Sequence, residues 1–246
     1  MAAISPKQTD VQAALRAFLL AVLPSGVEVI AAQQNRTAEP RSGDFVVMTP
    51  IRFRRIDTNI DTSADVRIVA SISGAVMTVS HVTIGTIAIG ATIFGAGVFA
   101  GTKVTRILTG GGGPGTYQVS PPQNVASEVM SAGAKTFQQN AEVTVQLDFH
   151  SAATSDAGDM AQTVSTLFRD IYAVDFFGDL PSPQNNVVPF YADDPRQMPF
   201  INENQQYEWR WILEAVMQVN QTVSISEPYA DAAVVDLISV DAAYPP

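Results

Sequence analysis

Apolar side chains recur at helical spacing in two segments of the chain. Steps of three and four residues place one apolar face on a helix over residues 11–23, made by Val11, Leu15, Phe18, Leu19 and Val22. Thr9-Asp10 can cap this helix and Pro24-Ser25-Gly26 can end it. The same spacing predicts a second amphipathic helix over 156–174, with Met160, Val164, Leu167, Phe168 and Ile171 on one face.

Strands are predicted between and after these helices. The segments 27–30 and 44–57 are β-rich, and 141–150 alternates strictly, with Val143, Val145, Leu147 and Phe149 on one face. Its partner strand is expected at 44–57. The segment 207–225 is the longest candidate and 233–240 can pair with it, whereas 176–206 is rich in Pro, Asn and Asp and predicts a long loop. This order predicts an α+β fold, a mainly antiparallel sheet packed with helices.

Residues 69–133 differ from the rest of the chain. They contain only three charged residues, Lys103, Arg106 and Glu128, and no charge occurs from Ile68 to Thr102. Such a stretch could span a bilayer, but it is broken by glycines, lacks leucine between 68 and 102 and is rich in Thr and Val, which favours short strands at 76–79, 86–89, 104–107 and 116–119. We expect a small all-β domain at 69–133, inserted into a discontinuous core of 1–68 and 134–246.

Composition excludes several kinds of chemistry. The 246 residues carry a net charge of −10, which disfavours specific nucleic-acid binding. The chain has no cysteine and only two histidines, so a disulfide framework, a thiolate nucleophile and a multi-histidine metal cage are excluded. No basic, apolar secretory leader is recognised, so synthesis in a host cytoplasm is expected. We expect no cofactor, no metal and no enzymatic activity.

Four weak motifs have simpler explanations. Gly95–Ala100 fits the spacing of a dinucleotide fingerprint but lacks the following helix, and Gly110–Gly115 lacks the ending of a P-loop, so both are read as turns. Asp148, His150 and Ser151 or Ser155 could form a hydrolase triad on paper, but a surface histidine at a strand end is favoured. The acidic residues Asp193, Asp194 and Glu203 lack the spacing of a calcium loop.

Positive charge and tryptophan gather at two places. Arg52, Arg54 and Arg55 form the local basic cluster, with Arg52 and Arg54 on one strand face, and predict either a solvated face or a contact with an acidic neighbouring subunit. Trp209 and Trp211 share a face with Tyr207 and Leu213, and are expected either to pack under the helices or to anchor a subunit interface.

Several longer runs resemble the neck or tail terminator proteins of tailed bacteriophages, the ring-forming proteins that cap the tail tube where it joins the head. The resemblance covers roughly 1–68 and 134–246 and is carried by Leu23-Pro24-Ser25-Gly26-Val27-Glu28-Val29-Ile30, Gly43-Asp44-Phe45-Val46-Val47-Met48-Thr49-Pro50, Tyr191-Ala192-Asp193-Asp194-Pro195-Arg196-Gln197 and Gln205-Gln206-Tyr207-Glu208-Trp209-Arg210-Trp211, with shorter runs at 32–36, 55–59, 199–202 and 237–241. Residues 69–133 depart from the minimal family form and resemble β-rich decoration modules of phage structural proteins.

The resemblance implies a structural virion protein of the tail or neck. It implies a homo-oligomeric ring, with a hexamer expected, that contacts the tail tube protein and the stopper or collar protein of the neck connector, with a tail sheath as a further candidate partner. An acidic lumen would let DNA pass without adhesion. The expected subunit or tube contacts are Arg52, Arg54, Arg55, Tyr191, Asp193, Asp194, Arg196, Phe200, Trp209 and Trp211. The alternative function is a virion surface adhesion module whose β insert binds a glycan or receptor.

Overall fold

A computed structural model describes residues 4–32, 43–151, 156–198, 200–201 and 207–228 of the chain. It contains two compact units. Unit 1 consists of Met1–Thr62 and Phe137–Ser224, and unit 2 consists of Ser63–Thr136 and the chain from Ile225. The chain therefore passes between the units three times. Each unit is described by itself below.

Unit 1 is built on a nine-stranded sheet. Its long strands follow the order β1(Ile4–Ser5), β12(Tyr207–Glu227), β8(Gly133–Ser151), β3(Phe45–Arg55) and β2(Glu28–Ala31). Strand β3 pairs antiparallel with β8 and parallel with β2, and β1 pairs antiparallel with β12. Four short strands complete the sheet: β4(Ile60–Ala64) on β8, and β9(Val187–Ala192), β10(Arg196–Gln197) and β11(Phe200–Ile201) on β12. The predicted pairing of 44–57 with 141–150 is confirmed, with Val46 opposite Phe149 and Met48 opposite Leu147.

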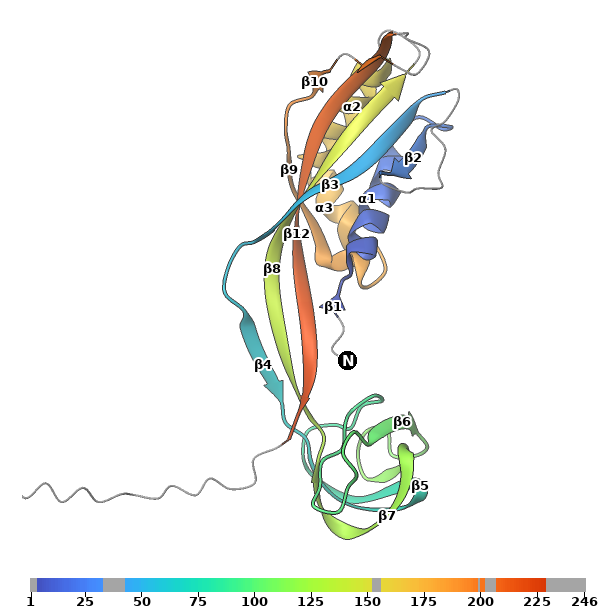
Figure 1. Ribbon diagram of the computed structural model, residues 1–246, viewed down its shortest axis with the longest axis vertical. Coiled ribbons are helices and arrows are strands. Elements are labelled where there is room, and N and C mark those ends of the chain that lie inside the picture. Colours follow the sequence, from blue (N-terminus) through green and yellow to red (C-terminus); the bar gives the residue numbers. More distant parts are fainter. Residues whose placement is uncertain (1–3, 33–42, 152–155, 199, 202–206, 229–246) are drawn as a thin grey trace, which may run out of the picture. The chain divides into compact units, whose positions relative to one another are not determined.

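Three helices, α1(Gln8–Val22), α2(Asp156–Phe168) and α3(Ile171–Gly178), lie beside the sheet in Figure 1. Alternate residues of the central strands meet them in one apolar core, as the spacing in the sequence predicted, and the strand members include Val143, Val145, Leu147 and Phe149. Phe18 of α1 is fully buried, and its ring centroid is 5.6 Å from those of Phe168, Phe176 and Phe177. This aromatic cluster joins the three helices.

Two sequence predictions are wrong in this part of the chain. The single helix expected over 156–174 is divided, because Asp170 caps a new helix by accepting a hydrogen bond from the Tyr172 backbone N–H at 3.0 Å. The long loop expected at 176–206 contains the end of α3, a 3-10 turn at Gln184–Asn186, and β9, β10 and β11. The sequence prediction missed β9 because Pro189 interrupts its strand pattern. Proline is tolerated there because the strand lies at the sheet edge.

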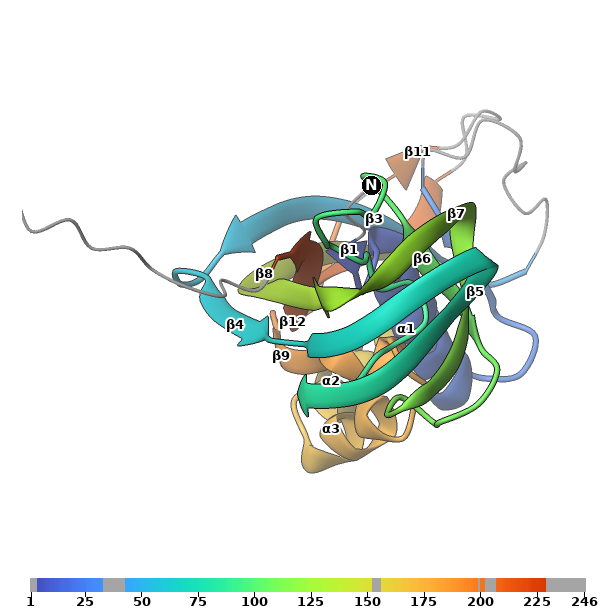
Figure 2. The ribbon, with the colours of Figure 1, turned by 90° about the horizontal axis from the view of Figure 1, so that it is seen from below.

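Unit 2 contains a three-stranded sheet with its own core. The strands β5(Arg67–Ile84), β7(Gly115–Ser131) and β6(Lys103–Ile107) follow one another in space, and β5 and β7 run side by side (Figure 2). The strand predicted at 86–89 does not form, because the chain turns at Ile89-Gly90. In the core, the buried amide of Gln123 donates to Thr102 Oγ1 at 2.7 Å and accepts from the Phe99 backbone N–H at 2.8 Å. The predicted strand at 233–240 lies outside the described residues.

We predict that Phe18→Ala destabilises unit 1 by about 3–5 kcal/mol, because truncation of a buried phenyl ring removes its packing and leaves a cavity. Both tryptophans of the chain belong to unit 1, so tryptophan fluorescence during urea unfolding reports this unit. Leu20→Ala is the matched control, since Leu20 lies on the same helix and is 45% exposed. Equal loss of stability in the two variants would contradict the role of the aromatic cluster.

We also predict an alkaline loss of stability in unit 2. Burial raises the pKa of Tyr117, and a backbone hydrogen bond at Gly112 lowers it by less. The unfolded chain, with a tyrosine pKa of about 10, therefore loses this proton first, and the contribution present below that pH is lost as pH rises through the higher folded pKa. The melting temperature of unit 2, measured by calorimetry from about pH 9 to pH 11, should fall less steeply with pH in Tyr117→Phe than in the unchanged protein. An identical slope in both proteins would show that Tyr117 does not couple to folding.

Candidate interaction surface of unit 1

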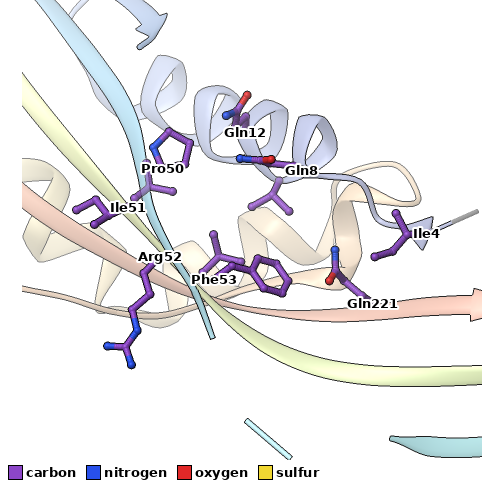
Figure 3. A pocket seen from close by; sticks show the side chains of 11 residues that line it. Ile4, Gln8, Gln12, Pro50, Ile51, Arg52, Phe53 and Gln221 are labelled. Carbon is purple, nitrogen blue, oxygen red and sulfur yellow. The ribbon is translucent and has the colours of Figure 1, made fainter. Parts of the chain in front are cut away.

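An apolar groove of about 480 Å³ lies between α1 and strand β3. In Figure 3, Gln8 and Gln12 of α1 lie on one side of the groove, and Ile51 and Phe53 of β3 on the other. The remaining lining residues are Ile4, Val11, Pro50, Arg52, Val143, Val145 and Gln221. Ile4, Ile51 and Phe53 are 43%, 50% and 52% exposed. A hollow with large apolar side chains open to solvent is typical of a protein-binding surface.

The shape of β3 produces this groove. The register with β8 shifts between Pro50 and Arg52, which leaves Ile51 as an extra residue. Beyond this bulge, Phe53 lies opposite Val143, while Arg52 and Arg54 lie opposite Thr144 and Glu142 and therefore face the other side of the sheet. Figure 3 shows the guanidinium of Arg52 pointing away from α1.

One edge of β3 has no strand beside it over Thr49–Arg55, within the part of the chain that the structure describes. Strand β2 pairs only with Phe45–Met48, and β8 pairs along the opposite edge. We call Thr49–Arg55 the open edge of β3. Unpaired backbone N–H and C=O groups along such an edge can accept a further strand.

The three predicted arginines all lie on the open edge of β3 and are exposed. Arg54 forms an ion pair with Glu142 at 2.9 Å, and Arg55 donates to the Asp57 carbonyl at 2.6 Å and to Asn59 Oδ1 at 3.0 Å. Arg52 has no ion-pair partner among the described residues. The expected contact of this cluster with an acidic neighbour stays a prediction.

A buried ion pair joins β8 to β12 on the sheet face opposite the helices. Asp148 is 4% exposed, and its Oδ1 accepts from Arg210 Nη2 at 2.6 Å and from Arg210 Nε at 3.0 Å. The Gln146 amide donates to both carboxylate oxygens, at 2.9 and 3.0 Å. The sequence placed Asp148 and Arg210 on the faces opposite the apolar ones, but not beside each other, because the register of two distant strands cannot be read from their alternation alone.

His150 is 6% exposed, so its interpretation as a surface histidine is wrong. Its imidazole stacks on Phe45, with ring centroids 4.5 Å apart and planes 6° from parallel. Asp148 and His150 do share a face, but the Asp148 carboxylate is bound by Arg210 and Gln146. This arrangement favours a structural role for both residues over the hydrolase triad.

A second predicted set lies along β9 and β10. Tyr191 is 43% exposed and touches the ring of Phe190, which is 64% exposed. Arg169 donates to the Ala192 carbonyl at 2.6 Å and pairs with Asp194 at 2.9 Å.

The same segment continues along β12, with which β10 and β11 pair. The Asp193 carbonyl accepts from Ser165, and Arg196 pairs with Glu214 at 3.3 Å. Phe200 lies in β11, opposite Glu208. This set and the arginine cluster occupy different edges of the sheet, β9 and β10 beside β12 and the open edge on β3.

Trp209 and Trp211 pack against the helix-side core, the first of the two expected placements. Gly158 of α2 gives room for this packing, since a Cβ there would lie 3.1 Å from Trp211 Cε2. Their contact with a neighbouring subunit stays a prediction.

The groove itself was missed by the sequence analysis. Ile51 and Phe53 alternate with Arg52 and Arg54, which could have indicated a two-faced strand, but their exposure depends on where β2 and α1 end. Among the described residues, no group of His, Asp and Glu is arranged to hold a metal ion, and no helix is long and apolar enough to cross a membrane.

A family model described as phage neck terminator protein matches residues 112–243, more than half of the chain. No curated protein matches the chain. The family match begins inside the segment 69–133, so that segment's assignment as an inserted decoration domain stays a prediction.

We predict that Arg210→Met destabilises unit 1 by about 3 kcal/mol, because it leaves the buried Asp148 charge without its cation; this is the low end for a broken buried pair, since the Arg210 side chain is 26% exposed. Arg54→Met is the matched control and should cost less than about 1 kcal/mol, because the Arg54 side chain is 52% exposed. Urea unfolding followed by circular dichroism measures both. Adding Asp148→Leu to Arg210→Met should restore part of the stability, and failure of both effects would refute the role of the pair.

Proposed function

The chain belongs to the phage neck terminator family, and from this we propose that it forms a closed ring of six copies that ends the tail tube and joins it to the neck connector. The family assigns a structural role in joining head and tail, as a component of the virion. The ring, its size and its named partners are the proposal. The family match is the observation that carries it.

The groove supports a ring built from unlike surfaces. A concave groove is filled by a protruding segment, so a contact through it would join it to a different surface of its partner. Contacts between two different patches repeat head to tail and close into a ring when the rotation allows. The exposed apolar rim of Ile51 and Phe53 suits such a contact between copies.

The charge of the chain supports passage of DNA through the ring. Outside 69–133 the chain carries a net charge of −11, while three of its arginines are concentrated on the open edge of β3. Phosphate groups adhere to basic walls, and acidic walls repel them. We propose an acidic lumen without specific nucleic-acid binding, with the basic edge directed to protein contacts.

The segment with Tyr191, Asp193, Asp194 and Arg196 is proposed to contact the tail tube or the stopper or collar protein of the connector. Exposed aromatic rings at Phe190 and Tyr191, with charged side chains around them, resemble the composition of a protein interface. A sheath contact is expected only if the tail is contractile. The β-rich segment 69–133 is proposed to be an inserted decoration domain.

We expect native mass spectrometry and negative-stain images of the purified protein to show rings of about six copies, as closed rotational symmetry predicts. Phe53→Ser should reduce the ring fraction by removing an apolar contact from the groove rim. Phe99→Ser is the matched control, because Phe99 is exposed to a similar extent, 59% against 52%, and lies in unit 2.

A protein that stays monomeric both alone and with isolated tail tubes would refute the ring. Binding of glycans or host cells through a monomer would then favour the adhesion module. Equal ring fractions in the two serine variants would be compatible with a ring, but would show that the contact between copies does not depend on the groove.

A further inference from the structure

No segment among the described residues fills the groove. The C-terminal sequence has the pattern of a strand that could fill it. The last strand, β12, ends at Glu227, and residues 229–246 lie outside the described structure. Within them, 233–240 reads Ala-Val-Val-Asp-Leu-Ile-Ser-Val, for which the sequence predicts a strand. The family match extends to residue 243, so this segment belongs to the shared family sequence.

Charge complements the groove. The segment 229–246 contains three aspartates and neither lysine nor arginine. The open edge of β3 carries Arg52, Arg54 and Arg55, and Arg52 has no ion-pair partner among the residues that the structure describes. The predicted strand carries one of these aspartates, Asp236, and is flanked by Asp231 and Asp241, so its charge is opposite to that of the arginine edge.

The alternation of side chains matches as well. In an added strand, Val235 and Leu237 would share one face with Ala233 and Ser239, and Asp236 would lie on the other face with Val234, Ile238 and Val240. On β3, Phe53 faces the groove, and Arg52 and Arg54 face the opposite side. One register therefore places apolar side chains on the groove and the Asp236 carboxylate beside the arginines. The open edge has seven residues and the segment eight, so the segment can cover the whole edge.

We propose that residues 233–240 of one copy add as a strand to the open edge of β3 in a neighbouring copy and cover its apolar groove. Backbone hydrogen bonds along the edge would give affinity, and the two faces would give register. This inference rests on the proposed ring, in which every copy donates one segment and accepts one. Only residues 229–232 join Pro228 to the segment, and five Cα steps span at most about 18 Å, so the proposal requires the acceptor edge to lie within that reach of the end of β12 in the donor copy.

Disulfide cross-linking tests the exchange directly, because the natural chain has no cysteine. Full-length protein with Ile51→Cys is mixed with full-length, affinity-tagged protein with Leu237→Cys, and oxidised gently. A disulfide requires Cα atoms within about 7 Å, so a tagged–untagged dimer is expected on non-reducing gels. Phe190→Cys replaces Ile51→Cys in the control mixture, since Phe190 is an exposed residue of the same unit. The groove mixture should give about tenfold more mixed dimer, because only its cysteines would meet the geometric requirement.

Equal dimer in the two mixtures would overturn the proposal. So would a chain carrying both Ile51→Cys and Leu237→Cys that closes its disulfide only within itself, since the segment would then occupy its own groove. Charge exchange is the second measurement: Arg52→Glu and Asp236→Arg should each lower the mixed dimer, and combining them should restore it. Absence of restoration would overturn the assigned register.

The native mass separates this proposal from the proposed function. Rings without groove-specific cross-links would refute strand exchange and leave the ring standing. Groove-specific cross-links in a protein that never closes into rings would support the exchange and refute the ring.

Discussion

The register of β12 is the constraint on which unit 1 depends. β12 pairs with β8 along one edge, and β1, β9, β10 and β11 all pair along the other. A shift by one residue would turn Trp209, Trp211 and Leu213 away from the helices. The buried contact between Arg210 and Asp148 forms only in the observed register. The apolar alternation and this ion pair therefore specify the same arrangement.

Local patterns were enough to predict much of this unit. Strict alternation at 141–150 identified the buried face of β8, and helical spacing identified α1, because in both segments burial on one side imposes a single period. The helix expected at 156–174 failed at Asp170, where a side-chain cap competes with helix continuation. The strand β9 was missed because Pro189 interrupts its pattern, although its position at the sheet edge makes proline acceptable.

The interaction surface shows a different limit of sequence reasoning. Charged clusters are visible in a sequence, and the arginines of β3 were found in this way. Exposed apolar residues are not, since Ile51 and Phe53 have the same letters as buried strand residues. Their exposure follows from β2 ending its pairing at Met48, a feature set by tertiary structure. Family membership then supplies the biological setting that neither the charges nor the groove could identify alone.

The uneven distribution of charge gives the two units different responses to ionic strength. Unit 2 has long uncharged strand segments in β5, whereas unit 1 carries the arginine edge and most of the acidic residues. Salt screens exposed charges beyond about 8 Å under physiological conditions, so contacts through the arginine edge should weaken in concentrated salt. Contacts through the uncharged part of β5, residues 68–84, would persist there. The salt dependence of binding would therefore show which of the two units contacts a given partner.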